Sequence, residues 1–203
     1  AETDKVFAVG AHIGDAMENT YSSALKNAFE VTGYPTAYVN RAAEWNYPEP
    51  SNVAQAVNTA QGSTNVGLAV GATLDGSTMN ILVSTGFAES VSGTKIVVFV
   101  LEDGILANQA NYTSYYGGGS NLSNFEHNHV LRASLTSLLG DQIPSSEYSA
   151  DNVYQVNFNV AVPSNVSSTE KMSVVAVVIN GSSNAAINVR GADFGDTQTF
   201  EEL

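Results

Sequence analysis

The sequence predicts an α+β protein in which a short helix-containing segment precedes an antiparallel β-sandwich of the immunoglobulin kind. Three observations predict this. Residues 1–62 alternate apolar runs with amphipathic stretches, whereas residues 63–203 contain short runs with an apolar residue at every second position. Gly, Asn and Ser turns separate those runs. About 43% of the 203 residues are hydrophobic, which is enough to bury a core. We therefore place a domain boundary between residues 62 and 63.

The N-terminal segment reads as strand, helix, strand, helix. The expected elements cover residues 5–13, 21–30, 33–41 and 51–61. The first is an apolar run of strand length, and the third follows a Gly–Tyr–Pro break. Asn19 or Thr20 can cap the first helix, because short polar side chains accept hydrogen bonds from the first free backbone N–H groups. Tyr21, Leu25 and Phe29 then share one face of that helix.

The C-terminal segment contains about seven expected strands. They cover residues 66–74, 79–87, 96–101, 126–135, 153–162, 172–179 and 185–190. Asp75-Gly76 is a hairpin signal between the first two. Strand 153–162 alternates apolar and amide residues, whereas 96–101 is apolar on both faces, as a central strand would be. Residues 103–125, rich in Asn, Tyr and Gly, are the longest irregular stretch.

Composition excludes several functions. The net charge of −13 argues against nucleic-acid binding and against adsorption to an anionic membrane surface. The chain has no cysteine, and therefore no disulfide, thiol nucleophile or cysteine-bound zinc. No G-x-S-x-G elbow or phosphate-binding loop is present, so we assign no catalytic residue and no cofactor. No run of 18 apolar residues could span a membrane as a helix.

The best-looking metal candidate is the pair His127 and His129. In a strand these two residues share a face, so both imidazoles could reach one ion. The only other histidine is His12, in the other segment, so a third ligand is missing. We therefore prefer a structural role, with both rings half-buried and hydrogen-bonded, and we predict no metal.

Three tyrosines in the irregular stretch form the best candidate binding surface. Tyr112, Tyr115 and Tyr116 directly precede three glycines, 117–119. Aromatic residues on a flexible loop suit protein or sugar recognition. The alternative is a loop that folds back over the sandwich with its tyrosines packed, and the sequence favours this alternative slightly.

The C-terminus carries a cluster of acidic residues, Asp193, Asp196, Glu201 and Glu202. Carboxylates are good calcium ligands, but their spacing fits no known calcium loop. We therefore expect a solvated terminus.

Three segments together resemble a known family. They are AVGAHIGDAM near the N-terminus, GYPTAYVNR over residues 33–41, and FEHNHVLRASLTSLLGDQIP over residues 125–144, of which HNHVLR is the most specific. Over essentially its whole length the chain is similar to the twenty-eight-kilodalton outer-membrane lipoprotein family of Bacteroidetes. The resemblance implies a partial thioredoxin-like segment over 1–62 with Pro35 as a structural cis-proline, and a β-rich domain over 63–203. It also implies a lipid anchor at the outer membrane.

The chain departs from the family in one respect. Many members carry a Cys-x-x-Cys helix ahead of the strand that here begins near Lys5, and this chain has no cysteine. We therefore expect a non-enzymatic cell-envelope lipoprotein module that binds a protein or a glycan and meets the membrane only through a lipid anchor outside this chain. The alternatives are a thiol-disulfide or chaperone-like protein whose cysteine-bearing half lies outside this chain, and a structural spacer.

Overall fold

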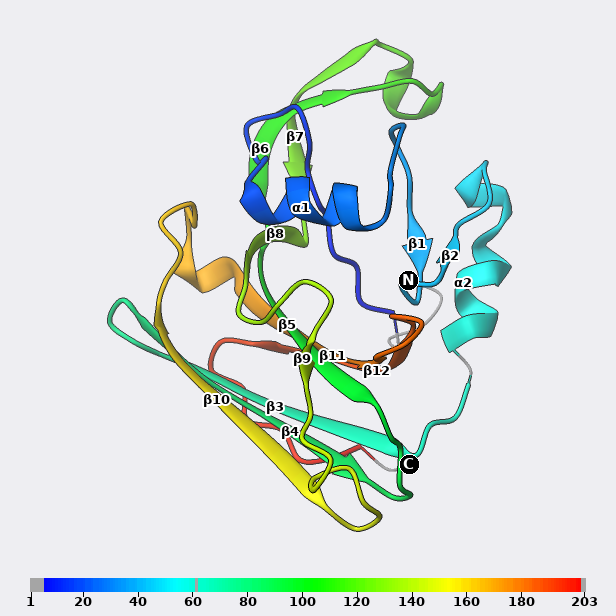
Figure 1. Ribbon diagram of the computed structural model, residues 1–203. Coiled ribbons are helices and arrows are strands. Elements are labelled where there is room, and N and C mark those ends of the chain that lie inside the picture. Colours follow the sequence, from blue (N-terminus) through cyan, green and yellow to red (C-terminus); the bar gives the residue numbers. More distant parts are fainter. Residues whose placement is uncertain (1–5, 61, 202–203) are drawn as a thin grey trace.

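The structure is a computed structural model that describes residues 6–60 and 62–201. The described chain is β-rich, with two short α-helices near its N-terminus and antiparallel sheets in the rest (Figure 1). In coarse outline this agrees with the expected mixture of helices and antiparallel strands.

Helix α1 (Thr20–Ala28) forms where the sequence predicts it. Its cap is Asn19, whose side-chain oxygen accepts hydrogen bonds from the N–H groups of Tyr21 and Ser22, each at 3.0 Å. The second expected helix is α2 (Val53–Ala60), preceded by the 3-10 turn η1 (Glu49–Ser51). Between the helices, β1 (Tyr38–Val39) and β2 (Ala43–Glu44) form a minimal hairpin.

The expected strand over 5–13 is wrong for the residues that are described. Only Gly10 pairs there, through an isolated parallel bridge to Val130. Its N–H donates to the carbonyl of His129 at 2.8 Å, and its carbonyl accepts from the N–H of Leu131 at 2.9 Å. The segment therefore crosses the end of a strand instead of lying inside a sheet.

The first layer of the sandwich is the three-stranded sheet β10–β4–β3. Its strands are β3 (Val66–Asp75), β4 (Thr78–Phe87) and β10 (Val153–Ala161). The predicted hairpin turn joins β3 to β4, and Gly76 takes the left-handed φ of 59° that a tight turn requires.

The second layer is the sheet β12–β11–β5–β8, with β9 also paired to β5. Its strands are β5 (Thr94–Glu102), β8 (Val130–Ser134), β9 (Asp141–Gln142), β11 (Met172–Asn180) and β12 (Ala186–Asp193). The 3-10 turn η3 (Thr169–Lys171) leads into β11.

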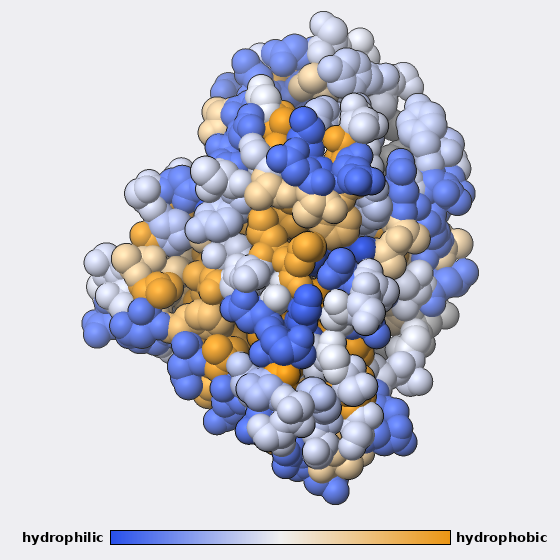
Figure 2. Space-filling view, in the orientation of Figure 1, coloured by the Kyte–Doolittle hydropathy of each residue, from blue (hydrophilic) through white to orange (hydrophobic). Residues whose placement is uncertain are grey.

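The main core lies between the two layers. Alternate residues of β3, including Leu68 and Val70, face alternate residues of β5 and β11, including Val98 and Ala176. Burying one Val or Leu side chain in this way contributes about 1.5–3 kcal/mol. Figure 2 shows hydrophobic residues reaching the surface across the middle of the molecule, whereas its top is mainly hydrophilic.

A second core lies on the opposite face of β5 and β11. Val97, Phe99 and Val177 point away from the sandwich and are buried beneath Leu25 of α1. The side-chain amide of Asn19 also donates to the carbonyl of Leu131 at 2.7 Å, which joins the helix start to β8. The N-terminal segment therefore covers an apolar sheet face that would otherwise meet water.

Two further expectations need correction. The stretch 103–125 contains a hairpin, β6 (Ile105–Ala110) and β7 (Asn121–His127), with the 3-10 turn η2 (Tyr115–Gly117) near its tip. The expected strand 126–135 is divided between β7 and β8, because the chain bends at residues 128 and 129.

The described part of the acidic terminus is also not simply solvated, whereas Glu202 lies outside the described residues. Residues 195–201 run along the edge of β3, where the carbonyl of Asp196 accepts from the N–H of Ala72 at 3.0 Å. The carboxylate of Glu201 pairs with Arg190 at 2.7 Å and also accepts from the N–H of Leu68. The tail therefore satisfies backbone groups that an uncovered edge strand would leave to water.

A buried ion pair joins three segments of the sandwich. The Nε atom of Arg132 in β8 lies 2.7 Å from the Oε2 atom of Glu102 in β5, and these side chains are only 5% and 1% exposed. The other carboxylate oxygen accepts from the N–H groups of Ser167 and Ser168 at 2.8 and 2.6 Å. Both carboxylate oxygens thus have partners, which a buried charge requires.

We expect strong coupling between Glu102 and Arg132 in unfolding experiments. Glu102→Gln or Arg132→Met alone should cost about 3–5 kcal/mol, because each leaves an uncompensated buried charge. The double variant should recover at least about 2 kcal/mol of the summed loss, because no unpaired charge remains. Urea unfolding of the four proteins measures this, and additive losses would contradict it.

The division into domains stays a prediction. We expect residues 63–203 to fold alone, because they contain both sheets and the core between them. Residues 1–62 should not fold alone, because α1 uses the outer face of the second sheet as its core. Amide dispersion in NMR spectra of the two fragments checks both statements. A dispersed spectrum from 1–62, or a collapsed one from 63–203, would contradict the boundary.

Candidate functional site

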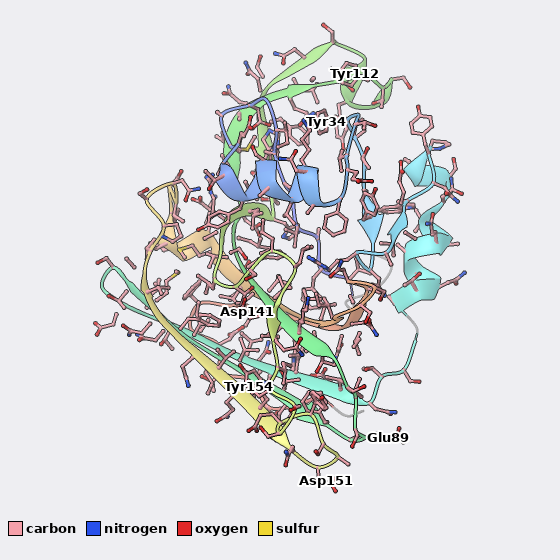
Figure 3. The ribbon with its side chains drawn as sticks, viewed as in Figure 1. Tyr34, Glu89, Tyr112, Asp141, Asp151 and Tyr154 are labelled. Atoms are coloured by element: carbon pink, nitrogen blue, oxygen red, sulfur yellow. The ribbon has the colours of Figure 1, made fainter. Side chains whose placement is uncertain are left out.

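The hairpin β6–β7 projects from the sandwich as an arm, which we define as residues 105–127 (Figure 1). Tyr112 and Tyr116 lie near its tip and are 82% and 72% exposed. Figure 3 shows Tyr112 at the far end of the arm, well away from Tyr154 in β10. The side chain of Tyr115 lies outside the described part of the structure. Tyr112 and Tyr116 are therefore presented to solvent, and the packed-loop alternative does not hold for them.

A row of aromatic rings runs along one face of the arm. The ring of Tyr116 stands edge-on to Phe125 at 5.7 Å between centroids, and Phe125 stands edge-on to His127 at 5.1 Å. His127 in turn contacts His12 of the N-terminal segment, with the ring centroids 5.0 Å apart. Edge-to-face pairs of this kind are favourable, so the row fixes the arm to the segment that crosses β8.

The two histidines predicted to share a strand face do not do so. β7 ends at His127, whereas His129 lies in the following turn with φ of 58°. The backbone N–H and the Nδ1 atom of His129 both lie near the Oδ1 atom of Asp103, at 2.5 and 3.3 Å. The chain bends between the two rings, so that His127 is buried while His129 is half-exposed, and the i, i+2 argument for a shared ion fails.

The histidine that lies beside His127 is His12, whose Nδ1 atom is 2.8 Å from the Oδ2 atom of Asp15. Sequence analysis missed this contact because His12 is distant along the chain. The spacing of His12 and Asp15, three residues apart, is the only local signal for their interaction. Within the described ranges, no group of three or more His, Cys, Asp or Glu residues is placed to hold a metal ion.

Burial lowers the pKa of His127. Its side chain is only 5% exposed, and its Nε2 atom has no hydrogen-bond partner among the described residues. Desolvation, and then the nearby His12, lower the pKa of His127 below its usual value, because both disfavour the charged ring. Asp15 and a hydrogen bond with the backbone of Ala107 act in the opposite direction, but the pKa stays below its usual value.

The remaining site residue, Pro35, lies in the loop between α1 and β1. The Tyr34–Pro35 peptide bond is cis, at the position where the family resemblance implies a cis-proline. A second cis bond joins Tyr47 and Pro48. Pro35 itself is exposed.

A surface hollow of about 510 Å³ lies at the base of the arm. Its ionisable lining residues are Asp103, Glu126, Glu170, Asp193, His129 and Lys171. One of these carboxylates, Asp103, is already bonded to the turn at His129. The hollow therefore carries a negative surface but no assembled ligand set.

The structure is a β-rich module with a projecting hairpin arm, and comparisons with known proteins identify its family. The family model for outer membrane protein Omp28 matches residues 22–198, which is most of the chain. The chain belongs to the Omp28 outer-membrane protein family, as the resemblance predicts, and this membership places it in the cell envelope at the outer membrane.

Solved structures give two further likenesses. HBP35 of Porphyromonas gingivalis matches with a TM-score of 0.66 and 15% identity, over 88% of this chain and 58% of that chain. A domain of the outer membrane lipoprotein Omp28 from Porphyromonas gingivalis matches with a TM-score of 0.40 and 14% identity, over 66% of this chain and 90% of that one. The first likeness shows a shared fold, and this chain spans 58% of the length of HBP35.

Comparison with curated protein sequences gives no match. Within the described residues, neither α-helix has the length and apolar character needed to cross a membrane.

We expect His127 to make the protein less stable in acid. An unfolded histidine titrates near pH 6.5, and the folded-state pKa lies lower, so the unfolded chain binds more protons as the pH falls through 6.5. Stability from this residue is complete above that pH and is lost below it. His127→Phe should keep the ring contacts and weaken the fall in Tm between pH 7.5 and 5.5. An unchanged fall would contradict this role.

The same residues test the metal hypothesis. His127→Ala should cost about 2 kcal/mol or more by leaving a cavity, whereas His129→Ala should cost less because its ring is half-exposed. A chelator should leave the Tm unchanged. A fall in Tm with chelator that Zn²⁺ restores, and that the double variant lacks, would overturn the structural role.

Proposed function

We propose that this chain is a non-enzymatic binding module of the cell envelope, and that its arm binds a protein or a glycan. The observation that carries the proposal is the exposure of Tyr112 and Tyr116 near the tip of a projecting two-stranded sheet. Tyrosine offers a large, rigid face with a polar end, and it loses little conformational entropy when it is buried.

The composition of the arm supports the proposal. Residues 104–125 contain no charged side chain, although the chain has 20 acidic residues and a net charge of −13. The arm is instead rich in Asn, Ser, Gly and Tyr. These residue types supply adaptable hydrogen bonds and aromatic contact area, as in antibody loops. A glycan or an acidic protein would thus meet no charge repulsion from residues 104–125.

The aromatic row gives the arm a fixed base. Phe125 and His127 hold β7 against the N-terminal segment, and Tyr116 packs on Phe125. A ligand at the tip would therefore meet a surface that is already ordered, which lowers the entropic cost of binding.

We propose that the sandwich is immunoglobulin-like and that the N-terminal segment is a partial thioredoxin-like unit. We also propose that the module meets the membrane only through a lipid anchor outside this chain, that it binds no nucleic acid, and that the absence of cysteine leaves it without thiol chemistry.

We expect Tyr112→Ala combined with Tyr116→Gly to weaken ligand binding by at least about tenfold, or about 1.4 kcal/mol. Glycine suits position 116 because its φ is 60°. Binding is measured on a printed glycan array and on immobilised mucin and fibrinogen. Tyr47→Ala is the matched control, because Tyr47 is also 82% exposed but lies outside the arm.

The folded state should survive these changes, because both arm side chains are exposed. Equal losses for the Tyr47 control and the arm variant would show that the arm has no special role. Failure of the unmodified chain to bind any of the probes would contradict the proposal as a whole.

A further inference from the structure

Strand β10 is an open edge of the sandwich. It lies at the end of the sheet β10–β4–β3, and among the described residues it pairs with β4 alone. The register runs without a bulge from Val153 opposite Gly86 to Ala161 opposite Thr78. The result is a straight edge of nine residues on the outside of the molecule (Figure 1).

The hydrogen bonds at both ends of β10 show which backbone groups are free. The N–H of Val162 donates to the carbonyl of Ser77, and the carbonyl of Asn152 accepts from the N–H of Phe87. The even-numbered residues therefore direct their backbone N–H and C=O groups toward β4, because hydrogen-bonded pairs alternate along an antiparallel ladder. The odd-numbered residues direct their N–H and C=O groups outward: Val153, Gln155, Asn157, Asn159 and Ala161. These groups find no hydrogen-bond partner elsewhere in the described chain.

The other outer strands of the two sheets each bond to a further segment of the chain. The C-terminal tail bonds to β3 through Asp196 and Ala72, and Gly10 bonds to the start of β8. The carbonyl of Asn40 accepts from the N–H of Ala186 at the start of β12, 2.9 Å away. Each of these three strands therefore has backbone hydrogen bonds to a further segment, whereas no described segment bonds to the outer side of β10.

The open edge also lacks the side chains that usually prevent strand pairing. Neither β10 nor β4 contains a charged residue or a proline. Lys, inward charges, bulges and proline are the common devices that keep an edge from pairing. The core-facing residues Tyr154, Val156 and Phe158 are only half-buried, and Val160 is 36% exposed. A further strand beside β10 would cover them.

We propose that β10 pairs with β10 of a second copy of this chain, antiparallel and centred on Asn157. The two three-stranded sheets would then form one continuous six-stranded sheet about a two-fold axis. In this register Asn157 lies opposite its own copy, Gln155 lies opposite Asn159, and Val153 lies opposite Ala161. On the core side, Tyr154 lies opposite Val160 and Val156 lies opposite Phe158.

The side chains that lie opposite each other in this register are compatible. Amides face amides, and aromatic residues face β-branched residues, which are stabilising cross-strand pairs. The acidic residue next to the strand, Asp151, would lie opposite Pro163 of the second copy and not opposite another carboxylate. A second copy is therefore accommodated at this edge even though each copy carries a net charge of −13.

Sedimentation velocity of the full chain from about 10 µM to 1 mM tests the pairing, because strand edges associate weakly. We expect a dimer whose fraction rises with concentration. Asn157→Pro should abolish it, because proline removes an outward N–H that β4 does not use. Asn157→Lys should also abolish it, by placing two like charges opposite each other. Asn157→Ala should leave the dimer unchanged.

Cross-linking gives an independent readout because the chain has no cysteine. Asn157→Cys should form a disulfide-linked dimer under mild oxidation, since paired strands place the two Cα atoms within disulfide range. Thr73→Cys is the control, because Thr73 is exposed on β3 and has no symmetric neighbour in this arrangement. The arm variant of Tyr112 and Tyr116 should dimerise normally, which separates this proposal from the function of the arm.

Three results would overturn the pairing. They are a chain that remains monomeric to about 1 mM, a dimer that persists in both Asn157→Pro and Asn157→Lys, and equal cross-linking of the two cysteine variants. A monomer that accepts an extended segment of another protein at β10 would also overturn it.

Discussion

Strands β5 and β11 are apolar on both faces, and the assembly of the molecule follows from the need to cover both. One face packs against β3 and β4 to make the sandwich core. The other face, with Val97, Phe99 and Val177, needs a different cover, and α1 supplies it through Leu25. Burial of apolar surface is the dominant favourable term in folding, so the N-terminal helix is held by the sheet more than by its own propensity.

The buried pair of Glu102 and Arg132 works within this frame. Glu102 is the last residue of β5, where the apolar run ends. Its carboxylate pairs with Arg132 of β8 and accepts from the backbone N–H of Ser167, just before η3. Water is excluded there, so each charge is tolerable only with its partners in place. The pair thus fixes how the strands that surround the base of the arm meet.

The candidate site depends on that base. The arm leaves the sandwich between β5 and β8, and its aromatic row is anchored on His127 and His12. The exposed tyrosines at the tip are therefore carried on a packed support, and residues 104–125 around them carry no charged side chain. The arm and the open edge of β10 are distinct surfaces, so ligand binding and self-association need not compete (Figure 3).

The sequence by itself determined the local elements. Asn19 caps α1, Gly76 turns the first hairpin, and β10 alternates as its apolar residues predict, because caps, turns and periodicity depend on residues within a few positions of each other. The family was also readable from short segments of the sequence.

Only the tertiary structure decided which distant segments meet. It placed His12 beside His127, laid the acidic tail along β3, and bent the chain at His129 so that one expected strand became two. The absence of charged side chains from residues 104–125 is visible in the sequence, but it does not predict a projecting hairpin. Such contacts lower the free energy only once the sheets exist, because each partner is brought into reach by packing elsewhere in the chain, and no local pattern of residues encodes that proximity.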